Sequence, residues 1–205
     1  MILVAGSSFT ATVYGDRMPK WHDHLVNPKH RKFNLATAGA GNIYIGESVK
    51  KLIGNKIRAC LIMWNHLGHL DVATDRPKIE LHLTSQLGGK FWNHYGNMAS
   101  GRGKSDWKRL GYEKVIQMNL ESIQSTHKAL DQLGIPYAYS FSHGDYRHTE
   151  DMTKNAIKPY IGDWAVEENS ERPMLMDDNY HANAEAHRQW SDLARSQISF
   201  KELIS

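Results

Sequence analysis

The chain has 205 residues, 40% of them hydrophobic, which is enough to bury one core and short for two domains. Its 25 basic and 22 acidic residues give a net charge of +3, so charge does not indicate a nucleic-acid partner. Cys60 is the only cysteine, which excludes an intramolecular disulfide and predicts a buried thiol within its apolar run. The opening apolar run, about five residues long, is too short for a signal peptide or a membrane span. We therefore expect a cytoplasmic protein with no membrane partner.

Short apolar runs that are typical of buried parallel strands occur along the whole chain. They occupy residues 2–5, 33–36, 59–64 and 136–141, with a shorter fifth run at residues 174–176.

Helical patterns lie between these runs. Apolar residues recur on one face of residues 42–53, and a longer pattern over residues 112–133 stops at Gly134. Residues 183–204 are predicted as a C-terminal helix. The alternation of strands and helices predicts a single α/β domain with a three-layer, open parallel sheet.

Two long segments, residues 68–109 and 143–172, have no strong period, and we predict irregular insertions there. They contain many aromatic residues, including Trp92 and Trp107, which we expect to form walls of a substrate site. The alternative is that these rings pack the loops onto the body or form an oligomer contact. The sequence leaves the oligomeric state open.

The two ends of the chain carry the residue types of a serine hydrolase. Ser8 follows the first predicted strand, and Asp178 stands three residues before His181. A carboxylate can orient an imidazole, which can in turn activate a serine hydroxyl as a nucleophile. The carboxyl ends of parallel strands share one edge of a sheet, so we expect Ser8, Gly39 and Asn65 to lie together there. The alternatives are that Ser8 caps a helix and that the Asp and His begin another one.

These segments resemble a known family. Gly6-Ser7-Ser8-Phe9 resembles the Gly-Asp-Ser-Leu nucleophile block of the SGNH (GDSL-type) hydrolases, with Ser7 in place of the aspartate. Residues 34–40 are similar to the second block of that family, and residues 178–181 are similar to the last. The resemblance implies the flavodoxin-like SGNH hydrolase fold over nearly the whole chain.

The resemblance also implies roles for these residues. Ser8 would be the nucleophile, His181 the base and Asp178 its orienting carboxylate, while the backbone N–H groups of Ser8 and Gly39 would bind the oxyanion.

The third block departs from the family pattern. Family members place Gly-x-Asn-Asp after the third strand, and its Asn side chain donates to the oxyanion, whereas this chain reads Trp64-Asn65-His66. Asn65 is the nearest match, and His66 or His69 is the alternative donor. Trp64 and His66 are also candidates for substrate contact. A Trp followed by a polar loop here is similar to divergent family members found in phages, so a viral source is one expectation.

The implied function is ester hydrolysis without a cofactor or a metal, on small acyl esters such as O-acetyl groups of carbohydrates. One alternative is a carbohydrate-binding or structural protein that has kept the fold without hydrolysis. Another is a metal-dependent hydrolase built from the loop histidines His66, His69, His143 and His148.

Two further motifs have simpler interpretations. His22-Asp23-His24 has the crowding of a metal site, but no Cys partner or HExxH pattern accompanies it, and we expect a solvated basic turn. Gly39-Ala40-Gly41-Asn42 opens a predicted helix, where N–H groups bind anions. It lacks the glycine and lysine patterns of nucleotide sites, so it favours an oxyanion over a phosphate.

Overall fold

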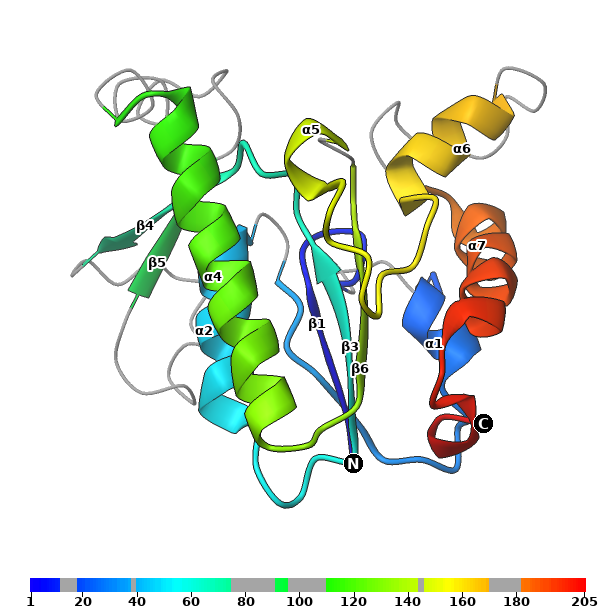
Figure 1. Cartoon of the computed structure of the whole chain (residues 1–205). Coiled ribbons are helices and arrows are strands. Elements are labelled where there is room, and N and C mark those ends of the chain that lie inside the picture. The colour runs from blue at the N-terminus through cyan, green and yellow to red at the C-terminus, as the bar shows by residue number, and fades with distance from the viewer. Residues whose placement is uncertain (12–17, 38–39, 75–90, 96–109, 144–145, 170–181) are drawn as a thin grey trace.

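The computed structural model describes residues 1–11, 18–37, 40–74, 91–95, 110–143, 146–169 and 182–205. At its centre is a four-stranded parallel sheet in the order β2-β1-β3-β6 (Figure 1). The strands are β1 (Ile2–Gly6), β2 (Lys32–Asn34), β3 (Ala59–Trp64) and β6 (Tyr137–Phe141). Every residue of β1, β3 and β6 is buried, which explains why these strands form apolar runs in the sequence.

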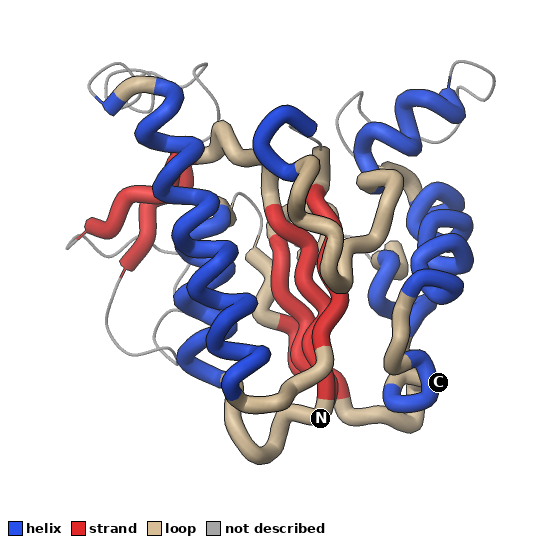
Figure 2. The backbone as a smooth tube through the Cα atoms, in the orientation of Figure 1, coloured by secondary structure: helices blue, strands red, loops and turns tan. Residues whose placement is uncertain are grey.

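Helices cover both faces of this sheet (Figures 1 and 2). On one face lie α2 (Asn42–Leu52) and α4 (Tyr112–Gln132), and on the other lie α1 (Trp21–Leu25), α6 (Ile161–Asn169) and α7 (Ala184–Gln197). The chain therefore has the three-layer, open parallel α/β fold that the alternation of strands and helices predicted.

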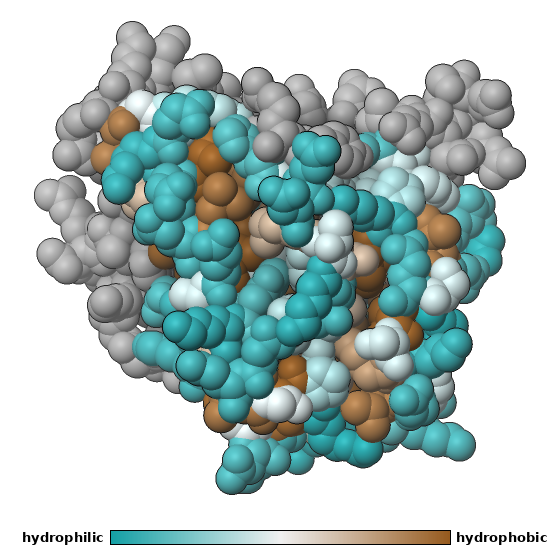
Figure 3. All heavy atoms as spheres, viewed as in Figure 1, coloured by the Kyte–Doolittle hydropathy of each residue, from teal (hydrophilic) through white to brown (hydrophobic). Residues whose placement is uncertain are grey.

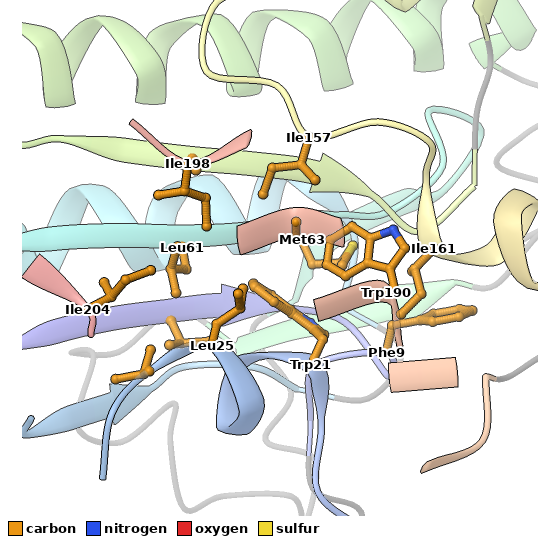
Figure 4. Close-up of a cluster of buried hydrophobic side chains, with 14 of the residues drawn as sticks. Phe9, Trp21, Leu25, Leu61, Met63, Ile157, Ile161, Trp190, Ile198 and Ile204 are labelled. Atoms are coloured by element: carbon orange, nitrogen blue, oxygen red, sulfur yellow. The ribbon is translucent and has the colours of Figure 1, made fainter. Parts of the chain in front are cut away.

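Successive side chains of a strand point to opposite faces, so the central strands contribute to two separate cores. Leu61 and Met63 of β3 belong to the cluster that includes α1 and α7, which Figure 4 shows. Cys60 and Ile62 belong to the cluster on the side of α2 and α4. Cys60 is fully buried, which confirms the predicted buried thiol, and this burial raises its pKa.

The two predicted central helices are confirmed as α2 and α4. Gly111 and Gly134 flank α4 with φ angles of 82° and 63°, a region that favours glycine, so the helix ends where the sequence predicts. Residues over the outer side of α4 are largely hydrophilic (Figure 3). Among the helices that the structure describes, none is long and apolar enough to cross a membrane.

The prediction of irregular insertions is wrong in parts of both segments. Residues 68–109 include an antiparallel hairpin of β4 (Leu70–Thr74) and β5 (Phe91–Tyr95). Residues 143–172 include α5 (Tyr146–Thr149) and α6. The helix α6 forms because Ile161 and Ala165, one turn apart, are buried against the sheet.

Other differences concern one additional helix and the ends of two elements. The helix α1 was not predicted, and β2 is shorter than the predicted strand at residues 33–36. The C-terminal helix ends at Gln197 and is followed by a short 3-10 helix, η1 (Lys201–Leu203). The predicted fifth strand at residues 174–176 lies outside the described residues.

Candidate active site

The strand order changes direction between β1 and β3, and this is where open α/β sheets bind ligands, beyond the carboxyl ends of the strands. Gly6, the last residue of β1, pairs with Met63 of β3. The chain therefore leaves both strands side by side, with Ser8 following one and Asn65 following the other. The predicted meeting of these two loops at one sheet edge is confirmed, while Gly39 lies outside the described residues.

Ser8 lies in a tight turn directly after β1. The backbone N–H groups of Thr10 and Ala11 both donate to the carbonyl of Ser7, at 2.9 and 2.8 Å. Ser7 and Phe9 are buried, whereas Ser8 is only partly buried. A Cβ at Gly6 would lie 2.3 Å from the Thr10 Oγ1 atom, so this turn requires glycine there. Residues 7–11 form a turn and not a helix, so Ser8 caps no helix within them.

Asp178 and His181 lie outside the described residues, but the segment that follows them is described. Asn183 caps α7 by accepting a hydrogen bond from the Ala186 N–H at 2.9 Å. Ala182, the residue after His181, is fully buried in the same cluster as Phe9, the residue after Ser8. Figure 4 shows Phe9 at one end of this cluster, on the side of Trp190.

Trp21 connects the start of α7 to the turn that carries Ser8. Its backbone N–H donates to Nδ1 of His187 at 3.3 Å, and its carbonyl accepts from Ser191 at 2.8 Å. Its indole N–H donates to the Thr10 hydroxyl at 3.1 Å. These contacts hold the first turns of α7 close to residues 7–11.

The side chain of Asn65 is fully used within the protein. Its amide nitrogen donates to the Ala40 carbonyl at 2.9 Å and to Nδ1 of His69 at 3.3 Å. Its oxygen accepts from the His66 N–H at 2.9 Å and from the Ser142 hydroxyl at 3.2 Å. An asparagine amide has two N–H donors, and both have acceptors here. The prediction that Asn65 donates to an oxyanion therefore does not fit this structure.

Asn65 instead links the loops that follow three strands. Besides the side-chain bonds, its backbone N–H donates to Oδ1 of Asn42 at 2.7 Å, and its carbonyl accepts from Nδ2 of Asn42 at 3.1 Å. Asn42 is the first residue of α2, and Ser142 directly follows β6. Asn65 thus joins the loops after β2, β3 and β6 through hydrogen bonds at the carboxyl edge of the sheet.

The N-terminus of α2 binds an anion that belongs to the protein itself. Asp71 of β4 accepts from the N–H groups of Gly41 and Tyr44, each at 2.9 Å, and is 3% exposed. A Cβ at Gly41 would lie 2.5 Å from the Asp71 carboxylate. A helix N-terminus favours negative charge, and Asp71 supplies it. Asp71 therefore occupies the N-terminus of α2 and excludes a phosphate there. The sequence did not indicate this contact, because Asp71 lies 30 residues from Gly41.

Three histidines lie in the loops that follow β3 and β6, and one of them contacts the turn of Ser8. The rings of His66 and His69 pack edge to face, with their centroids 5.6 Å apart. The rings of His143 and Phe9 pack in the same way, with their centroids 5.3 Å apart. Burial is the main cause that lowers the pKa of His66 to about 4, and the neighbouring imidazoles of His69 and His143 act in the same direction. His66 is therefore neutral at neutral pH. In the described parts of the chain, no three His, Cys, Asp or Glu side chains are arranged to hold a metal ion.

The four predicted substrate contacts have different outcomes. Trp64 is fully buried and donates to Nε2 of His127 at 3.3 Å, so the prediction that it contacts substrate is wrong. His66 remains at the edge of the sheet and is partly exposed. Trp92 pairs with Ala73 in the β4–β5 hairpin, and its side chain is outside the described residues, as is Trp107.

The His22-Asp23-His24 motif belongs to α1 and is not a solvated turn. His22 is 2% exposed, and its Nε2 lies 3.0 Å from the Thr10 carbonyl. Burial alone would raise the pKa of Asp23, but its bonds with His22 and Lys32 hold the pKa well below its usual range. The motif supports the turn after β1. The sequence signal for the helix α1 was the spacing of its two apolar residues, Trp21 and Leu25.

Comparison with known proteins supports the fold alone. No family model matches the chain, and the search of curated proteins finds no match. The chain is similar to the crystal structure of protein YxiM from Bacillus subtilis, with a TM-score of 0.51 and 12% sequence identity. The match covers 98% of this chain and 56% of YxiM, so the chain spans little more than half of that protein. This similarity agrees with the α/β class that the sheet and its flanking helices define.

Proposed function

We propose that the protein is a serine ester hydrolase of the SGNH type, with Ser8 as the nucleophile. The observation that carries this proposal is the position of Ser8 on a tight turn at the carboxyl end of β1, beside the end of β3. Buried neighbours on both sides fix the turn, while Ser8 itself is partly exposed. A nucleophile needs this combination of a fixed backbone and an accessible hydroxyl.

In the proposed reaction, Ser8 Oγ attacks the carbonyl carbon of an ester. His181 takes the hydroxyl proton and returns it to the departing alcohol, which leaves an acyl group on Ser8. His181 then takes a proton from water, whose oxygen attacks the acyl carbon, and gives that proton to Ser8 Oγ as the bond to the acyl group breaks and the acid leaves. Asp178 holds the imidazole in the required orientation and stabilises its charged form.

The proposed partnership of Ser8 with His181 is supported by their direct neighbours. Phe9 and Ala182 are members of one buried cluster. Trp21 joins the start of α7 to Thr10 through hydrogen bonds. The chain therefore enters α7 close to the turn of Ser8. A histidine just before α7 must start from such a position if it is to act as the base for Ser8.

The proposed substrates are small acyl esters, among them O-acetyl groups on carbohydrates. The support for this class is the resemblance of the Ser8 and Asp178–His181 segments to the family, which acts on such esters. Trp92 and Trp107 would offer flat faces to a sugar ring. The backbone N–H groups of Ser8 and Gly39 would bind the oxyanion.

Hydrolysis of p-nitrophenyl acetate by the wild type and Ser8→Ala tests the proposal. Turnover in the wild type and its loss in Ser8→Ala are expected, whereas Ser199→Ala, an exposed serine near the C-terminus, should keep the wild-type rate. Equal rates in wild type and Ser8→Ala would refute a serine mechanism. Loss of activity to a chelator would favour a metal hydrolase, and no turnover in any variant would favour a binding protein.

A further inference from the structure

The oxyanion hole of the proposed reaction lacks its usual side-chain donor. Both N–H groups of the Asn65 amide bond to protein acceptors, the Ala40 carbonyl and Nδ1 of His69. Turning this amide toward a substrate would break the bonds that hold the loops after β3 and β6 together. A different donor at the same edge is therefore needed.

The loop that follows Asn65 is held rigidly. The backbone N–H of His66 donates to the Asn65 oxygen at 2.9 Å. From α4, the buried Asn119 amide donates to the carbonyls of Leu67 and His69 at 2.8 and 2.9 Å. Donors that are fixed before the reaction stabilise developing charge most effectively, because they need no reorganisation. Residues 65–69 meet this condition.

Within this loop, His66 is the histidine whose ring is available. Nδ1 of His69 already accepts from Asn65, and His69 is 5% exposed. Neither ring nitrogen of His66 has a hydrogen-bond partner among the residues that the structure describes, and the side chain is partly exposed. A neutral imidazole carries one N–H that can donate.

The position of His66 relative to Ser8 follows from the sheet. Gly6 of β1 and Met63 of β3 are paired, so Ser8 and His66 leave neighbouring strands at the same edge. His143, which is close enough to influence His66 electrostatically, packs against Phe9 at 5.3 Å. His66 and the turn of Ser8 therefore belong to neighbouring loops at the carboxyl edge of the sheet, and His143 lies between the two loops as a neighbour of both.

We infer that the His66 imidazole N–H donates to the oxyanion of the tetrahedral intermediate, in the place where related enzymes use an asparagine amide. This inference rests on the proposed ester hydrolysis and names the residue that completes its site. His66 is thus a catalytic residue, and Asn65 and Asn119 are positioning residues that hold its loop.

Replacement of His66 by three different residues tests the inference with p-nitrophenyl acetate. His66→Ala should lower kcat by about 10²- to 10³-fold with little change in KM, the usual effect of losing one oxyanion donor. Asn and Gln carry an uncharged amide N–H and cannot act as a base. His66→Asn places that donor near the position of Nδ1, and His66→Gln near Nε2, so one of them should recover most of kcat.

The matched control is His30→Ala, which removes a histidine before β2 at the opposite edge of the sheet and should leave kcat unchanged. Unfolding temperatures of all variants separate folding defects from kinetic ones, and the Asn and Gln variants carry the test if His66→Ala does not fold. Full kcat in His66→Ala, with Ser8→Ala inactive, would overturn the inference and leave the proposed function intact. Equal loss in all three variants would also overturn it, because that pattern indicates a base and not a donor. A wild type without turnover would refute both.

Discussion

The carboxylate of Asp71 lies 2.9 Å from the backbone nitrogen of Gly41 and closes the N-terminus of α2. It also accepts from the Tyr44 N–H, and its burial keeps water away from both donors. Asp71→Ala should therefore lower the free energy of unfolding by about 1–3 kcal/mol, because buried N–H groups lose their acceptor. Urea denaturation measures the change, and the exposed Asp192→Ala on α7 serves as the control. An unchanged unfolding midpoint in Asp71→Ala would contradict this role.

Gly41→Ala should destabilise the protein through the same contact. A Cβ at this position would lie 2.5 Å from the Asp71 carboxylate, so the hairpin or the helix must shift. The loss should be smaller in an Asp71→Ala background, since the clash is then absent. A double-mutant cycle by chemical denaturation measures this coupling. Additive losses would show that the two residues act independently.

Asn65→Ala should affect folding more than catalysis. The substitution removes bonds to Ala40, His66 and Ser142, and we expect a loss of about 3 kcal/mol in the free energy of unfolding. Thermal and urea unfolding measure it. If the stability were unchanged while kcat fell about 10²- to 10³-fold, Asn65 would be an oxyanion donor after all.

His127 should make stability depend on pH. Burial is the main cause that lowers its pKa to about 4, against an ordinary value of 6.5, and its Nε2 accepts from the Trp64 indole. The unfolded chain therefore binds more protons between these pH values, so stability is complete above pH 6.5 and falls as the pH drops toward 4. His127→Gln keeps an acceptor for Trp64 but does not titrate. Its unfolding free energy should fall less over this range, and an identical pH profile would contradict the assignment.

The sequence was sufficient to predict those elements whose burial produces a clear pattern of apolar residues. Residues 59–64 are buried on both faces, so β3 appears as an uninterrupted apolar run with the predicted bounds. The stop of α4 was predictable because Gly134 adopts the left-handed conformation that ends helices. The position of Ser8 followed from the same logic, since it is the residue that leaves a buried first strand.

The sequence was insufficient where a polar side chain is buried by a distant partner. Residues 68–109 were predicted as irregular because they have no strong period, and nothing in the sequence indicates that Asp71 of this segment contacts the N-terminus of α2. Asn65 has the residue type of an oxyanion donor, but only the fold brings the Ala40 carbonyl and His69 to its amide. In both cases residue type indicates a chemical capacity, and tertiary contacts determine how it is used.

Whether Ser8 is the nucleophile is tested directly by treating the protein with a fluorophosphonate and locating the adduct by mass spectrometry of proteolytic peptides. We expect one adduct, on Ser8, that is absent in Ser8→Ala and still formed in Ser199→Ala. An adduct on another residue, or no adduct in a folded protein that hydrolyses p-nitrophenyl acetate, would contradict it.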